Sequence, residues 1–153
     1  MLRALAVHPS QRIRNTGVVW TFFRRKPAPP PVDSPLAGAP RRARLKTYSA
    51  QSGYVYQYVY RGHRVAGQTA TEYVFSATPD RKNWQLIRVV LDHGTLDTWH
   101  SDTGRVLLPV ECYAIAKLAL FDFFDESRRG EAPESIHLTA EEITKYLDSL
   151  GRL

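Results

Sequence analysis

Cysteine is nearly absent from this sequence, and long apolar runs are missing. The single cysteine, Cys112, excludes an internal disulfide and a zinc site built from several cysteines. The apolar run at residues 18–23 is far too short to cross a bilayer. Residues 4–7 are too short for the hydrophobic part of a secretory signal, and no small-residue cleavage pattern follows them. We therefore expect a cytoplasmic protein without a membrane span.

Acidic residues are almost missing from the first 46 positions. Those positions hold ten Lys or Arg and one acid, Asp33, whereas positions 47–153 hold eleven Lys or Arg and fourteen acids. The net charge of +6 therefore comes entirely from the N-terminal part. Residues 26–44 also contain six prolines and no periodic apolar pattern. Such a composition is typical of an extended, unfolded segment.

These features predict a disordered basic arm at residues 1–46 and one folded domain at residues 47–153. An arm of this kind binds nucleic acid through charge, without reading its sequence. In a eukaryote the arm would resemble a mitochondrial transit peptide and place the protein in the matrix; otherwise it is a genuine arm or a start codon assigned too early. The candidate nucleic-acid contacts are Arg24, Arg25, Lys26, Arg41, Arg42 and Arg44.

The first part of the domain has the two-residue period of β-strands. Tyrosines alternate with valine and glutamine over residues 53–61, and aromatic and β-branched residues favour a pleated strand. Residues 71–78 and 84–91 follow as two further strands. The turn between them, residues 78–84, resembles the Asp-box of propeller hairpins, although Lys82 replaces its glycine and one residue is missing. Short connections between consecutive strands predict an antiparallel meander.

The second part of the domain has the longer period of helices. Residues 95–101 predict a short helix that buries Leu96 and Trp99. Pro109 suits the first position of a long helix that is apolar on almost every side. Thr139 and Glu142 form a capping box before an amphipathic C-terminal helix. With residues 135–138 as an edge strand, the sequence predicts an α+β fold: a sheet of three or four antiparallel strands covered by one long and two shorter helices.

The tyrosine-rich strand is the most distinctive feature, and it permits three interpretations. Its rings form part of the core, bind a peptide or protein, or stack on nucleic-acid bases. The strand resembles the aromatic strand of RNA-recognition motifs, but three strands precede the first helix, so we reject that family. Leu86 and Val90 fall in the same alternation frame as Trp84, and we place them on the tyrosine face. The candidate partner-binding tyrosines are Tyr54, Tyr56, Tyr58, Tyr60 and Tyr73.

A cluster of carboxylates ends the long helix, where the helix dipole favours cations instead. The acids are Asp122, Asp125 and Glu126. A solvated helix stripe and a binding site for a basic partner, including the chain's own arm, both account for them. We include all three among the candidate partner-binding residues.

Catalytic and metal-binding patterns are weak. His93, Asp97 and His100 have helical spacing, but a solvated face explains them better than a metal site. Cys112 is expected to be a small buried side chain. The sequence has no Gly-rich phosphate loop, no G-x-S-x-G and no H-E-x-x-H. We expect no metal or cofactor and favour a non-catalytic module that binds a protein or peptide. Nucleic-acid association through the arm and an enzyme of unidentified class are the alternatives.

Overall fold

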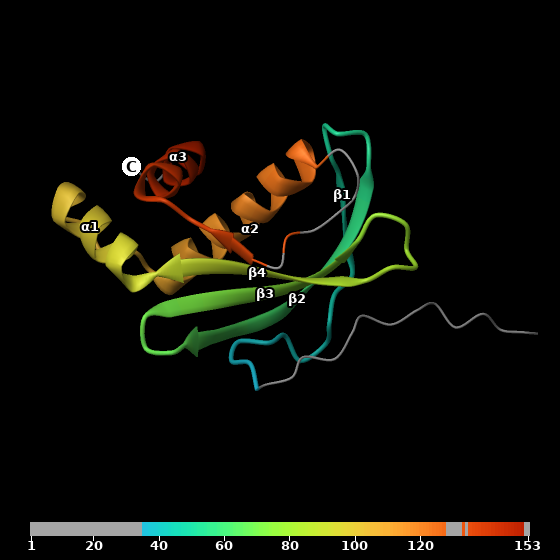
Figure 1. Cartoon of the computed structure of the whole chain (residues 1–153), viewed down its shortest axis with the longest axis horizontal. Coiled ribbons are helices and arrows are strands. Elements are labelled where there is room, and N and C mark those ends of the chain that lie inside the picture. The colour runs from blue at the N-terminus through green and yellow to red at the C-terminus, as the bar shows by residue number, and fades with distance from the viewer. Residues whose placement is uncertain (1–34, 128–132, 134, 152–153) are drawn as a thin grey trace, which may run out of the picture.

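The structure is a computed structural model that describes residues 35–127, 133 and 135–151. Within these residues the chain has an α+β fold, in which helices pack on one sheet (Figure 1). The elements, in chain order, are β1 (Lys46–Ser49), β2 (Val55–Ala66), β3 (Ala70–Thr78), β4 (Gln85–Asp92), α1 (His93–Thr103), α2 (Pro109–Glu126), β5 (Ser135–His137) and α3 (Ala140–Ser149).

The sheet has five strands in the order β1-β2-β3-β4-β5, and it is mixed. The strands from β1 to β4 pair antiparallel, as their short connections require. β5 pairs parallel with β4, because α1 and α2 carry the chain back along the sheet before β5 begins. The predicted meander of three or four antiparallel strands is therefore wrong on two points. The sheet has five strands, and its edge strand β5 is parallel to β4. β1 was missed because only four residues form it.

β2 continues beyond the predicted tyrosine strand, through a bulge. Tyr60 pairs with Phe75 and Gly62 with Val74, so Arg61 is the extra residue. The bulge returns the His63 side chain to the same face as the tyrosines, opposite Tyr73. The aromatic side chains on this face of β2 therefore extend past Tyr60 to His63.

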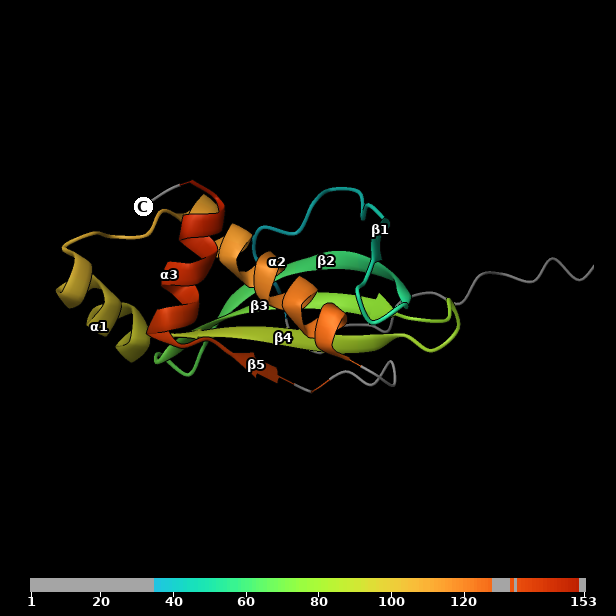
Figure 2. The same ribbon diagram turned by 90° about the horizontal axis from the view of Figure 1, so that it is seen from above.

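Figure 2 shows α2 lying across one face of the sheet, with α3 beside it and α1 at one end. α2 begins at Pro109, and the buried Glu111 carboxylate accepts a hydrogen bond from the Leu108 N–H at 2.9 Å. The predicted capping box of α3 is confirmed, since Thr139 Oγ1 and the Glu142 carboxylate exchange hydrogen bonds with each other's backbone N–H. α1 is longer than the predicted helix, because it follows β4 directly.

The face of the sheet under α2 holds the core, and the core interpretation is confirmed for Tyr56 and Tyr58. Only 2% and 3% of their surfaces are exposed. The Tyr56 ring stacks on Phe124 with centroids 4.0 Å apart. Leu86 and Val90 do not share this face. The register pairs Ile87 with Phe75, so Ile87, Val89 and Leu91 of β4 lie under the helices. We had counted the alternation of this strand from Trp84. The strand begins at Gln85, and its odd-numbered residues point toward the helices.

Residues 35–45 form a strap along the outer edge of β2, which we call the N-terminal strap. Ala37 and His63 exchange two backbone hydrogen bonds, of 2.8 and 2.9 Å. Gly62 permits this approach, because a Cβ there would lie 2.6 Å from the Ala37 carbonyl oxygen. Within residues 35–46, which we assigned to the arm, Ala37 thus contacts β2 and Lys46 begins β1.

In the described part of the chain, no helix is both long enough and apolar enough to span a membrane.

Candidate functional site

Two adjoining cavities open between the N-terminal strap, β2 and the first half of α2. The smaller has a volume of about 180 Å³ and the larger about 350 Å³. Both are lined by Gly38, Tyr60 and Tyr113, so the two cavities adjoin. We call the pair the tyrosine groove. The smaller cavity also has Pro40, Arg44, Lys46 and Tyr58 as lining residues, and the larger has His63, Tyr73, Pro109 and Val110.

Aromatic rings fix the shape of the tyrosine groove. The rings of Tyr60 and Tyr113 lie 4.8 Å apart, and the imidazole of His63 stacks on Tyr73 at 5.5 Å. The Tyr60 hydroxyl and His63 Nδ1 are 3.2 Å apart and share a hydrogen bond. Tyr60 also contacts Phe75 of the core at 5.3 Å. The groove wall is therefore an extension of the packed core and is rigid before any ligand binds.

The tyrosine hydroxyls stay neutral at physiological pH. Burial raises the pKa of Tyr58 and of Tyr60 to about 12, and the nearby Tyr113 hydroxyl raises both further. Burial also raises the pKa of Tyr113. A neutral hydroxyl both donates and accepts hydrogen bonds. The groove therefore offers hydrogen bonds without carrying phenolate charge.

The larger cavity borders an exposed apolar surface at the start of α2. Val110, which lines the cavity, has 67% of its surface exposed, and the nearby Val106 and Leu108 have 70% and 58% exposed. Of these three residues, Val110 lies at the larger cavity and Val106 at another cavity, beside α1. An exposed apolar side chain beside a cavity is typical of a surface that another molecule covers.

The predicted partner-binding tyrosines divide into two sets. Tyr58, Tyr60 and Tyr73 line the tyrosine groove. Tyr56 lies deeper under α2, and Tyr54 precedes β2 and packs beside Tyr56 with ring centroids 6.1 Å apart. Because α2 covers this face, the four tyrosines of the predicted strand do not form an open platform.

The predicted carboxylate cluster makes contacts within the domain. Asp125 accepts hydrogen bonds from the Tyr48 hydroxyl at 2.8 Å and from the Gln51 N–H at 2.7 Å. Asp122 accepts from Lys145 at 2.5 Å and from the Tyr146 hydroxyl at 3.0 Å. These contacts join the end of α2 to β1 and α3, whereas Glu126 is exposed. Binding of a basic partner here stays a prediction, and Glu126 is the most accessible of the three carboxylates.

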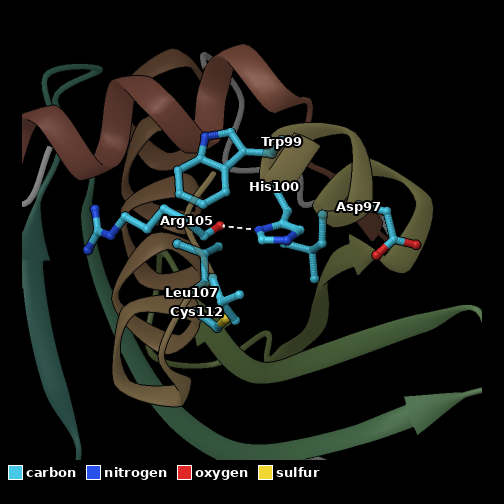
Figure 3. A pocket seen from close by; sticks show the side chains of 8 residues that line it. Asp97, Trp99, His100, Arg105, Leu107 and Cys112 are labelled. Atoms are coloured by element: carbon cyan, nitrogen blue, oxygen red, sulfur yellow. Dashed lines mark hydrogen bonds between the residues drawn. The ribbon is translucent and has the colours of Figure 1, made fainter. Parts of the chain in front are cut away.

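A third cavity, of about 190 Å³, lies between α1, the loop after it and α2, and it brings His100 and Cys112 together (Figure 3). His100 Nδ1 lies 2.9 Å from the Arg105 carbonyl oxygen, so this nitrogen carries the proton and donates. Burial raises the pKa of the Cys112 thiol. A protonated thiol is a weak nucleophile. The cavity therefore has the residue types of a catalytic dyad without an activated nucleophile.

The helical histidines each bond to other groups. His93 lies near Thr71 Oγ1 at 3.3 Å and the Gln68 carbonyl oxygen at 3.1 Å, while His100 contacts Arg105. No group of three His, Cys, Asp or Glu side chains able to hold a metal ion occurs among residues 35–127, 133 and 135–151.

The candidate nucleic-acid contacts are only partly described. Arg41, Arg42 and Arg44 are exposed on the N-terminal strap. Arg24, Arg25 and Lys26 lie outside the described residues.

Several groove residues were missed from the sequence. Gly38, Pro40 and Lys46 lie in the segment that we predicted to be a disordered arm, and Tyr113 lies on the long apolar helix, outside the candidate residues. One pattern in the sequence does bear on the groove. Tyr113 and Lys117 are four residues apart, which places them on the same face of the helix. The pairing of Ala37 with His63 depends on contacts that no local pattern encodes.

No protein-family model, no curated protein and no solved structure matches this chain.

Proposed function

We propose that this protein is a non-catalytic binding module that holds an extended peptide segment of a partner protein in the tyrosine groove. The observation that carries the proposal is that two adjoining cavities share Gly38, Tyr60 and Tyr113 as lining residues. Two open cavities side by side suit a chain segment better than a compact small molecule, which a protein usually encloses.

The chemistry of the groove supports a peptide ligand. Tyrosine is enriched in protein interfaces because its ring provides apolar contact area while its hydroxyl provides a hydrogen bond. Tyr60, Tyr73 and Tyr113 are held by ring contacts and hydrogen bonds, so binding costs them little conformational entropy. Exposed Val110 supplies an apolar contact at the open rim.

The test is a selection from a displayed library of random 12-residue peptides, with the full chain as bait. Selected peptides should bind in solution, and Val110→Glu should weaken them by about tenfold or more, because it places a charge at an apolar rim. Glutamate in the first turn of α2 is compatible with the helix. A matched control is Val55→Glu, at the start of β2 on the sheet face turned away from α2, which should leave binding unchanged.

Three results would contradict the proposal. They are a library without enrichment, selected peptides that bind Val110→Glu as tightly as the unaltered chain, and equal weakening by Val55→Glu. The melting temperatures of both variants are measured first, so that a loss of fold is not mistaken for a loss of binding.

Nucleic-acid association is a second candidate function, and one observation favours it. Arg41, Arg42 and Arg44 are exposed, and within the described residues no carboxylate pairs with them. They are available to phosphates without breaking any ion pair described here. Removing residues 1–34, which hold six cations, separates their contribution to binding from that of Arg41, Arg42 and Arg44.

A further inference from the structure

The smaller cavity of the tyrosine groove collects positive charge. Arg44 and Lys46 line it, and Lys117 lies one helical turn after Tyr113. Lys117 rests over the Phe121 ring, with its Nζ 5.3 Å from the ring centroid. Burial lowers the pKa of Lys117, and repulsion from Lys46 lowers it further.

These three cations lack a carboxylate partner among the described residues, unlike cations elsewhere in the domain. Arg64 pairs with Glu72 at 2.8 Å, Arg105 with Glu111, and Lys145 with Asp122 at 2.5 Å. Bringing like charges together without a counter-ion costs free energy. A bound anion would remove that cost, so charge complementarity indicates the kind of ligand that fits here.

Two tyrosine hydroxyls complete the polar lining of this cavity. Tyr58 and Tyr113 both line it, and within the described chain neither hydroxyl has a hydrogen-bond partner. Burial keeps both hydroxyls protonated, so both donate. Hydrogen bonds to a charged acceptor are about twice as strong as those between neutral groups. An anion in this cavity therefore gains donors as well as charge.

We infer that the peptide carries an acidic side chain, whose carboxylate binds between Arg44, Lys46 and the hydroxyls of Tyr58 and Tyr113, while its apolar neighbours extend along Tyr60 toward Val110. This inference rests on the proposed function, because the cavity is one end of the peptide groove. The acidic side chain would fix the direction of the peptide and select among partners, while the apolar contacts supply most of the affinity.

The experiment uses the peptides selected with the full chain. We expect Asp or Glu to be enriched at one fixed position relative to the apolar residues. In titration calorimetry, changing that acid to its amide should weaken binding about five- to tenfold, as removal of a partly exposed charge contact does. The double variant Arg44→Gln/Lys46→Gln should bind acid and amide peptides equally. The matched control, Arg41→Gln/Arg42→Gln, changes two exposed cations that do not line the groove and should keep the preference.

The two proposals fail in different ways. If selected peptides bind and are weakened by Val110→Glu but show no acid preference, the inference is wrong and the peptide groove stands. The inference is also wrong if the preference persists in Arg44→Gln/Lys46→Gln or disappears in the control. If no peptide is selected at all, the groove itself is refuted and the inference falls with it.

Discussion

Gly38 and His63 are in such close contact that a Cβ on Gly38 would lie 2.7 Å from His63 Cε1 and 2.8 Å from Nδ1. Gly38 also has a φ of 65°, a conformation that other residues rarely adopt. The contact seats the N-terminal strap against β2 beside the tyrosine groove. Glycine at this position therefore permits the strap to lie against His63 where both line the larger cavity.

Replacing Gly38 by alanine should release the strap. The clash and the positive φ together should cost about 1–2 kcal/mol, and trypsin should then cut faster at Arg41, Arg42 and Arg44. Gly67→Ala is the control, because Gly67 has a φ of 59° but no atom within 4 Å of the added Cβ. If both variants lose stability equally and trypsin cuts neither faster than the unaltered chain, the contact with His63 does not hold the strap.

Two tyrosines that stack on α2 should respond oppositely to loss of their hydroxyl. The Tyr56 hydroxyl is buried and has no hydrogen-bond partner within the described residues, whereas Tyr48 donates to Asp125 at 2.8 Å. Leaving a buried polar group unpaired costs about 1–3 kcal/mol. Tyr56→Phe should therefore raise the melting temperature, and Tyr48→Phe should lower it. A lower melting temperature for Tyr56→Phe would show that its hydroxyl has a partner.

Removal of a whole buried ring should be far more damaging. Tyr56→Ala and Tyr58→Ala each leave a cavity beneath α2 and should cost about 3–5 kcal/mol in urea unfolding. Tyr54→Ala should cost less, because Tyr54 is only half-buried. Near-neutral effects at both Tyr56 and Tyr58 would contradict the packing under α2.

Asp80 should make the β3–β4 turn sensitive to acid. Hydrogen bonds from the backbone N–H groups of Asn83 and Lys82 lower the pKa of Asp80 far below its ordinary 3.8. Its ionised form therefore stabilises the fold at all pH values above about 4, and this contribution is lost as the pH falls below that value toward the lowered pKa. Melting temperatures measured from pH 5 to pH 2 should fall less steeply in Asp80→Ala than in the unaltered chain. If the melting temperatures of the two chains fall equally with pH, the acid sensitivity comes from groups other than Asp80.

Nucleic-acid binding, if present, should depend on the basic N-terminal residues. Removing residues 1–34 takes away six of the ten cations that precede residue 47, including Arg24, Arg25 and Lys26, and keeps the strap. Binding of a fluorescent single-stranded DNA should then weaken strongly, and in the full chain it should decline steeply with salt. At about 200 mM salt, contacts between cations and phosphates are largely screened. Tight binding by the shortened chain under that condition would therefore indicate that tyrosine rings stack on the bases.

The sequence was informative where local chemistry determines structure. The capping box at Thr139, the start of α2 at Pro109 and the turn at Asp80 depend on residues within a few positions of each other, and each appears in the structure. The alternation over the tyrosines also predicted a strand with a buried face.

Pairing between distant segments could not be predicted in the same way. β5 joins β4 in parallel across two helices, and the Ala37 backbone bonds to His63 although prolines surround it in sequence. The tyrosine groove depends on both the strap and α2, so only its tyrosine wall was foreseen. Its cationic end required knowing that Arg44 and Lys46 line the same cavity as Tyr113.

The strap also protects the sheet from other copies of the chain. β1 covers β2 only as far as Tyr58, and the remaining edge carries the bulge at Arg61 and the bridge to Ala37. An uncovered strand edge is a template on which other chains pair and aggregate. A shortened chain that begins at residue 47, where composition alone would place the boundary, would expose that edge. One that begins at residue 35 keeps the bridge between Ala37 and His63 on that edge.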